Sequence, residues 1–189
     1  MVDKAALYDL VKSQSLEYDK FEKVHPLQTW KYHLLPVIKN ACDLARRFGA
    51  DTEVAEMAAL FHDYAALVDF EKYYKTHHIA SGELAQPILL AAGYDQDFID
   101  RVKKCVASHR GSVNISKSSI EEVCLADADA MTHIDNAFEI IMWMGQRGSS
   151  IQDGSAFVKK KMTNSFAKLS PQTKELVRPK YEAIMTICY

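Results

Sequence analysis

The sequence predicts an all-α protein that folds as a single compact domain over residues 1–189. Apolar residues recur at helical spacing along most of the chain, and no long alternation of β-branched and polar residues indicates a strand. Glycine and proline are scarce, with 7 and 5 residues, and no low-complexity linker or internal repeat divides the chain. A chain of this length suits one domain with a substantial core.

Local signals set the ends of the expected helices. In "FGAD", Gly49 suits the left-handed position that ends one helix, and Asp51 or Thr52 can cap the next. Gly93 and Asp95 repeat this arrangement in "AAGYDQDF". The chain from 69 to 76 is expected to form a single turn or a loop. Helices are expected near residues 4–21, 29–48, 52–63, 77–92, 96–109, 119–145, 153–168 and 171–188.

The later helices have start signals of their own. Ser118 followed three residues later by Glu121 is a capping-box pattern, which places a helix start near residue 119. Ser170 before Pro171 is typical of a capped N-terminus with proline in the first turn. The C-terminal helices are therefore expected either to cover the core or to form the face of a homodimer.

Pro36 lies inside the helix expected over 29–48. Proline has no backbone N–H, so it leaves the carbonyl of Tyr32 without its usual helical donor. We therefore expect a bend in this helix, close to His33.

Composition excludes several classes of function. The formal net charge of −2 does not suggest a nucleic-acid surface, and the run Lys159–Lys161 is interpreted as a solvated helix face. The start of the chain shows no signal-peptide pattern, and the longest apolar stretch, 137–145, contains a glutamate and is too short to cross a bilayer. Four dispersed cysteines without a CxxC pair are expected to be reduced core residues. We therefore expect a cytoplasmic protein without membrane or nucleic-acid partners.

A titratable pair interrupts an apolar helix in "AALFHDYAALVDF". His62 and Asp63 lie side by side where the flanking residues indicate core. Desolvating a carboxylate is costly unless a charged partner or a metal ion accompanies it. One explanation is a bound cation, whose other ligands must come from the rest of the chain.

Other metal-capable side chains recur at the edges of apolar helix faces on five expected helices. Any single one of them is more often a hydrogen-bonded core residue or a helix cap than a ligand. Together, however, four histidines and two aspartates converging from several helices are how helical bundles build dinuclear metal centres. Imidazole and carboxylate ligands suit one or two ions of Fe, Mn, Co, Ni or Zn. The histidines are His33, His62, His77 and His109, and the aspartates are Asp63 and Asp127, with Asp129 as the neighbour of Asp127.

The order of these residues resembles the H…HD…D signature of the HD-domain metal-dependent phosphohydrolase superfamily. The stretch from His33 to Asp63 is similar to the family's two-helix segment, and "HHIASGELA" is similar to its His-x-x-x-Gly-Ala-x-x-Ala helix. "VASHRG" and "LADADAM" resemble two later motifs. The similarity covers roughly residues 30–135, so the resemblance implies an HD-domain bundle with N- and C-terminal helices packed on it.

The resemblance also implies the roles of individual residues. The first metal is implied to bind to His33, His62, Asp63 and Asp127. A second metal is implied at His77 and His109, with Asp63 bridging the two ions and His78 as a substitute for His77. Asp129 or His78 is then expected to transfer a proton to or from the reacting groups.

The chain departs from the family at one position. Many family members follow the His-Asp pair with a Gly-Lys whose lysine meets the phosphate, whereas this chain has Ala65 and Ala66 there. The candidates for the missing positive charge are Lys72, Lys75 and Arg110.

The expected function is metal-dependent hydrolysis of a nucleotide or another small phosphate ester by a metal-activated water. One alternative is a dinuclear-iron oxygenase, because a branch of the same superfamily uses the same ligand set. Another alternative is a non-catalytic ligand-binding module on the same fold. The intact ligand set favours an enzyme over the binding module.

Overall fold

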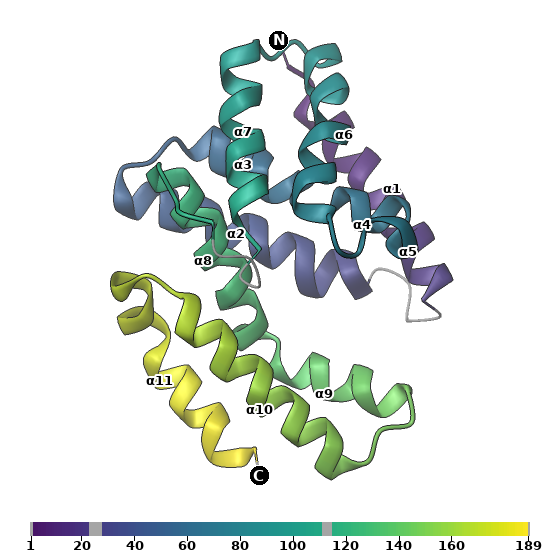
Figure 1. Cartoon of the computed structure of the whole chain (residues 1–189), viewed down its shortest axis with the longest axis vertical. Helices are drawn as coiled ribbons and strands as arrows, with labels where there is room; N and C mark the ends of the chain where they lie inside the picture. Colours follow the sequence, from purple (N-terminus) through teal and green to yellow (C-terminus); the bar gives the residue numbers. More distant parts are fainter. Residues whose placement is uncertain (1, 23–27, 111–114, 189) are drawn as a thin grey trace.

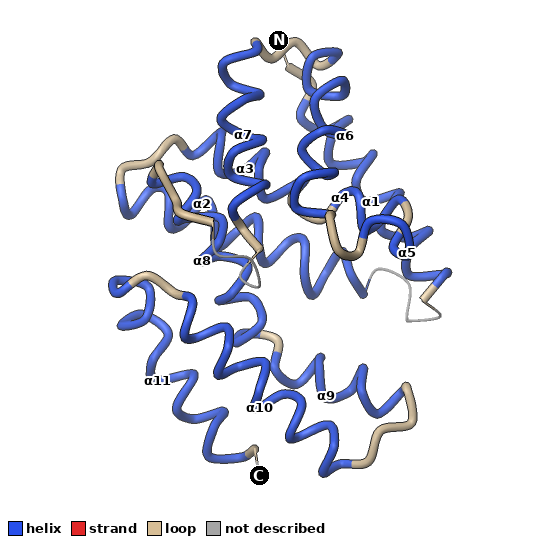
Figure 2. Tube along the Cα trace, viewed as in Figure 1, coloured by secondary structure: helices blue, strands red, loops and turns tan. Residues whose placement is uncertain are grey.

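The computed structural model describes residues 2–22, 28–110 and 115–188, and all regular elements in these ranges are helices (Figures 1 and 2). The prediction of an all-α fold is therefore confirmed. In chain order, the elements are α1 (Lys4–Phe21), the π-helix η1 (Trp30–Leu34), α2 (Leu35–Phe48), α3 (Thr52–Phe61), α4 (Tyr64–Val68), α5 (Phe70–Tyr73), α6 (His77–Ala91), α7 (Gln96–Ser108), α8 (Ile120–Asp135), α9 (Ala137–Gln146), α10 (Ile151–Lys168) and α11 (Pro171–Ile187).

The helix expected over 29–48 contains a π-helical turn. Pro36 lies in the first turn of α2, and the turn immediately before it is the π-helix η1. The carbonyl of Tyr32 accepts a hydrogen bond from the side-chain amide of Asn136. The disturbance expected from Pro36 thus takes the form of a wider turn, and this turn carries His33.

Two other expected helices end earlier than predicted, and a second helix follows each of them. The segment expected as one helix over 52–63 ends at Phe61, and a short helix, α4, begins at Tyr64. The break falls at His62 and Asp63. The segment expected over 119–145 divides into α8 and α9 at Asn136, whose φ of −107° and ψ of 30° are not helical.

Two clusters of buried apolar side chains form the interior. The larger one lies among α1–α8, where α2 packs against both α3 and α8. The smaller one joins the C-terminal half of α8 to α9, α10 and α11, and includes Ile134, Val158 and Met162. Figure 1 shows α9–α11 as a separate layer below the other helices, with α8 between the two groups. Met131 of α8 packs against both clusters.

Among the described residues, no helix combines the length and the apolar character that crossing a bilayer requires.

Candidate metal centre

Six metal-capable side chains from distant parts of the chain form two adjacent groups. The first group is His33, His62 and Asp129, and the second is Asp63, His77 and His109. Within each group, the candidate ligand atoms all lie within 4.8 Å of one another. The side chains come from η1, the break between α3 and α4, the start of α6, the end of α7 and the middle of α8.

Asp63 joins the two groups through its two carboxylate oxygens. Its Oδ2 lies 3.2 Å from Nε2 of His33 and 3.4 Å from Nε2 of His62. Its Oδ1 lies 3.4 Å from Nε2 of His77 and 3.7 Å from Nε2 of His109. Each oxygen therefore faces a different pair of imidazoles, which is the arrangement of a carboxylate that can bridge two cations.

Backbone carbonyls orient three of the four imidazoles. In each case Nδ1–H donates to the carbonyl three residues earlier, at 2.7 Å from His62 to Ala59, at 2.6 Å from His109 to Val106 and at 3.0 Å from His77 to Tyr74. A carbonyl can only accept, so Nδ1 carries the proton in each ring. The lone pair of the neutral ring is then on Nε2 and points into the cluster, as a metal ligand requires.

The electrostatics of the cluster favour a positive charge between its carboxylates. Burial acts to raise the pKa of Asp63, but the neighbouring histidines, His62 first, hold it well below its ordinary value. Burial also opposes the protonated form of His62, yet the carboxylates of Asp63 and Asp129 raise its pKa to about 9. The Nε2 atoms of His33 and His62 approach to 3.1 Å. This set of imidazole and carboxylate donors fits a divalent metal ion.

Asp127 is not in the cluster, contrary to the prediction. Its carboxylate accepts hydrogen bonds from the backbone N–H of Ser170, at 3.0 Å, and from the Ser170 hydroxyl, at the start of α11. Residues two apart on a helix lie on nearly opposite faces, so only one of Asp127 and Asp129 can face the histidines. The structure places Asp129 there, with its Oδ1 3.8 Å from Nε2 of His33, and we correct the expected aspartate accordingly.

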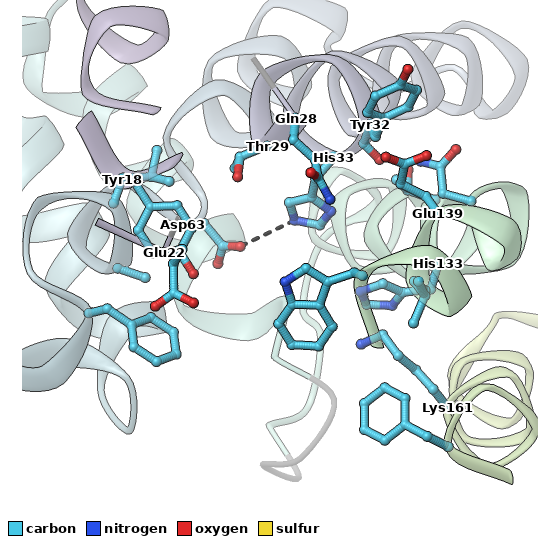
Figure 3. A pocket seen from close by; sticks show the side chains of 18 residues that line it. Tyr18, Glu22, Gln28, Thr29, Tyr32, His33, Asp63, His133, Glu139 and Lys161 are labelled. Carbon is cyan, nitrogen blue, oxygen red and sulfur yellow. Dashed lines mark hydrogen bonds and ion pairs between the residues drawn. The ribbon is translucent and has the colours of Figure 1, made fainter. Parts of the chain in front are cut away.

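A cavity of about 360 Å³ opens beside the first group (Figure 3). His33 and Asp63 lie on its wall, joined by a hydrogen bond, and His133 lies between His33 and Lys161 (Figure 3). The lining also contains polar, acidic and aromatic side chains. The aromatic side chains of the lining are Tyr18, Tyr32, Phe70, Trp143 and Phe157.

The predicted phosphate-binding cations do not line this cavity. The ammonium of Lys72 lies 4.7 Å from the centre of the Tyr73 ring. The guanidinium of Arg110 donates to the backbone carbonyl of Lys75. The structure therefore does not bring Lys72, Lys75 or Arg110 together with the cavity beside the cluster.

His78, the predicted substitute for His77, belongs to neither group, and its ring lies 5.8 Å from that of His77. Its side chain is buried, burial lowers its pKa, and its Nδ1 has no hydrogen-bond partner among the described residues. His77 occupies the cluster, as the register of the motif indicated. His78 does not line the cavity, and the proton-transfer role expected of it stays a prediction.

Sequence reasoning missed two residues of the cavity, His133 and Lys161. The imidazole of His133 stacks on that of His33 at 5.8 Å between ring centres, and its Nε2 lies 3.7 Å from Oδ1 of Asp129. Burial lowers the pKa of His133 to about 3, so the ring is neutral at neutral pH. The signal for His133 was its position one helical turn after Asp129.

Lys161 lies beside the buried residues Val158 and Met162 on α10. The run of three lysines concealed this position, because Lys159 and Lys160 are exposed as expected. The signal that could have distinguished Lys161 was its spacing of three residues after Val158.

Comparison with known proteins identifies relatives of the chain. The model of a family described as HD domain matches residues 30–133. Two curated relatives are both called symmetrical bis(5′-nucleosyl)-tetraphosphatase. The protein from Halalkalibacterium halodurans is 45% identical over 47 residues, which are 25% of each chain. The protein from Bacillus subtilis is 58% identical over 33 residues, which are 18% of each chain. The matches thus span a quarter or less of these relatives.

Two solved structures share the fold over nearly the whole chain, each at 21% identity. One is described as a predicted HD superfamily hydrolase from an uncultured Thermotogales bacterium. It has a TM-score of 0.63 and covers 96% of this chain and 87% of its own. The other is Bacillus subtilis YpgQ in complex with ADP, with a TM-score of 0.65 and coverage of 97% and 93%.

Proposed function

Because the chain belongs to the HD domain family, whose model matches residues 30–133, we propose that it is a metal-dependent phosphohydrolase. The proposed substrate is a nucleotide or another small phosphate ester. The observation that carries this proposal is the carboxylate of Asp63, whose two oxygens face two different groups of metal-capable side chains.

The two groups supply the proposed ligands. One metal ion would be held by His33, His62 and Asp129, and a second by His77 and His109, with Asp63 shared between them. The ions proposed are Fe, Mn, Co, Ni or Zn, which accept imidazole and carboxylate together. When bound, such ions acidify a water molecule and polarise a phosphoryl oxygen.

The protein's own side chains orient the reaction. Asp63 fixes the two groups relative to each other, and the carbonyls of Ala59, Val106 and Tyr74 hold three imidazoles in the ligating orientation. His133 lines the cavity beside His33, and its neutral ring can orient the attacking water by accepting a hydrogen bond from it. Asp129 becomes a proposed ligand.

The cavity supports a small substrate that combines a ring with a phosphate. A volume of about 360 Å³ lies within the range of small-molecule sites. Its aromatic side chains offer stacking surfaces for a base, while His33 and Asp63 of the candidate metal centre lie on its wall. The ADP bound by YpgQ and the activity that names the two tetraphosphatases favour a nucleotide.

A phosphate-release screen with Asp63→Asn tests the proposal. Wild-type protein loaded with each of the proposed metals is offered nucleoside mono-, di- and triphosphates, dinucleoside tetraphosphates and simple phosphomonoesters. We expect release by the wild type and a loss of roughly 100-fold or more in Asp63→Asn, because both groups lose their shared anionic ligand.

The matched control is Asp97→Asn, which removes an exposed carboxylate in the first turn of α7. It should retain both metal content and activity. Hydrolysis that is equal in wild type and Asp63→Asn, or that is absent with every metal, would contradict the proposal. An iron-loaded protein with a mixed-valent spectrum and no phosphate release would instead support the oxygenase alternative.

A further inference from the structure

We propose that Lys161 of α10 binds a phosphate group of the substrate beside the metal centre. The C-terminal helices would then supply a substrate-binding cation to a centre built by the preceding part of the chain. This inference rests on the proposed function, since it names the residue that recognises the anion at the same site.

The position of Lys161 is fixed by its neighbours on α10. Val158 and Met162 are fully buried in the smaller apolar cluster, and α10 packs along α8. Lys161 lies beside them on the helix and lines the cavity together with His33 and Asp63. Figure 3 shows its side chain extending from α10 into the cavity, next to His133.

The ammonium of Lys161 is available to a ligand. Among the described residues, no acceptor lies within hydrogen-bond or ion-pair distance of it. Burial lowers its pKa, while the carboxylates of Asp129 and Asp63 act in the opposite direction from farther away. A partly buried ammonium without a direct partner is unfavourable, and an anionic ligand between it and the metal centre would satisfy it.

The other charges around the cavity leave this role to Lys161. Among the described residues of the lining, it is the only lysine, and there is no arginine. Arg147 lies close by, but its guanidinium pairs with Glu22 and stacks 4.2 Å from the centre of the Trp143 ring. Glu139 also lines the cavity, and its carboxylate would repel a phosphate from that part of the wall. Among the described residues of the lining, Lys161 is therefore the one direct cationic partner for an anion that enters the cavity.

The test compares Lys161→Met and Lys161→Arg with the control Lys160→Met, which changes the exposed neighbouring lysine. For the best substrate of the screen, we expect Lys161→Met to raise KM roughly 10- to 100-fold, the effect of losing one charged hydrogen bond. The change in kcat should be smaller, Lys161→Arg should recover most of the loss, and Lys160→Met should match the wild type.

A binding measurement separates recognition from turnover. Calorimetric titration of the metal-loaded proteins with ADP and with inorganic phosphate should show affinities that fall in Lys161→Met by the same factor as KM rises. Metal content, measured on the same samples, should not fall, because removing a cation does not weaken a cation site. Lys161→Gln serves as a second neutral variant if the methionine disturbs the packing of α10.

The outcomes distinguish this inference from the proposed function. Absence of phosphate release by the wild type overturns the function, whereas weaker ADP binding in Lys161→Met still supports Lys161. Unchanged KM and anion affinity in an active Lys161→Met overturn the inference. So does a loss that follows a fall in metal content, or the failure of both probes to bind the wild type.

Discussion

Asp127 and Asp129 are two residues apart on α8, yet their carboxylates meet different parts of the molecule. Asp129 faces His33 and His133, while Asp127 holds the start of α11 through Ser170. The sequence motif contains both aspartates and cannot say which one faces inward. That choice depends on the rotation of α8 about its axis, which packing against α2 and α10 sets.

This assignment gives the first prediction. Asp129→Asn is expected to lose metal and to reduce phosphate release roughly 100-fold or more, because an anionic ligand is lost. Asp127→Asn is expected to retain its metal but to lower the free energy of unfolding by about 1–3 kcal/mol, since Ser170 loses a charged acceptor. Metal analysis and urea denaturation of both variants measure these effects. Loss of metal from Asp127→Asn alone would reverse the assignment.

The second prediction concerns pH and His62. In the metal-free protein its pKa is about 9, above the ordinary value near 6.5, because the carboxylates outweigh the effect of burial. A ligating imidazole must be unprotonated, so metal affinity is expected to rise up to about tenfold per pH unit between about pH 7 and pH 9. Calorimetry in buffers of different protonation enthalpy would measure the released proton. An affinity that is constant over this range would contradict the assignment of His62.

The same pKa predicts the stability of the metal-free protein. A pKa that is higher in the folded than in the unfolded chain contributes stability that is fully present below about pH 6.5. This contribution is lost as the pH rises through about 9. Thermal denaturation with a chelator should therefore show a falling midpoint across this range, and His62→Gln should reduce the dependence.

At the residue scale, the sequence predicted five of the six clustered side chains. His33, His62, Asp63, His77 and His109 could be identified because each interrupts or ends an apolar helical pattern. The lining of the cavity could not be identified from the sequence, because His133 and Lys161 contribute to a site that exists only once α10 packs on α8. Lys161 is distant in sequence from Ala66, so the pattern around the His-Asp pair does not point to it.

At the scale of elements, the break between α3 and α4 sets the directions in which the side chains of His62 and Asp63 point. Consecutive residues on a continuous helix diverge by about 100°, and Asp63, with φ −108° and ψ 9°, departs from helical geometry. Apolar periodicity continues through this break, so the pattern alone predicted one helix up to residue 63. The ends marked by Gly49 and Gly93 were predicted well, because both residues have the positive φ that favours glycine.

Gly82 controls the approach of α6 to α7 and gives the third prediction. A Cβ at this position would lie 3.3 Å from Cγ and 3.5 Å from Cα of Lys103. Gly82→Ala requires only a small movement of a flexible side chain, and its better helix propensity offsets the cost, so we expect a change within about 1 kcal/mol. Gly82→Val is expected to lower the free energy of unfolding by about 1–3 kcal/mol and to reduce metal content by displacing His77.

Chemical denaturation and metal analysis of the two variants test this expectation. Gly82→Val with wild-type stability and metal content would show that α6 does not need this close approach. The alanine variant is the matched control, because it adds the Cβ without the branched methyl groups.

At the scale of the whole molecule, α8 belongs to both apolar clusters, so the layer formed by α9–α11 is packed against the core that holds the centre. The C-terminal helices α10 and α11 pack on α8, and the two roles expected of them from the sequence stay predictions. A homodimer and a single folding domain remain predictions. The sequence could not place this layer, because no motif in residues 140–189 resembles a known pattern.

The fourth prediction separates the two clusters. Met162→Ala is expected to lower stability by about 2–5 kcal/mol, because the side chain is fully buried in the smaller cluster, while metal content is retained. Met57→Ala is the matched deletion in the larger cluster. Hydrogen exchange should show the loss of protection centred on α9–α11 for Met162→Ala and on the earlier helices for Met57→Ala. Identical exchange patterns would argue against two separable clusters.

The two carboxylates of α8 serve two parts of the molecule. Asp129 belongs to the candidate metal centre, and Asp127 holds the layer of C-terminal helices through Ser170. The cluster around Asp63 can stay constant while residues of α9 and α10 change the shape and charge of the opposite wall. A designer who wished to redirect the proposed activity would therefore leave the histidines unchanged and diversify positions such as Trp143 and Phe157, keeping Asp127 as the anchor of the exchangeable layer.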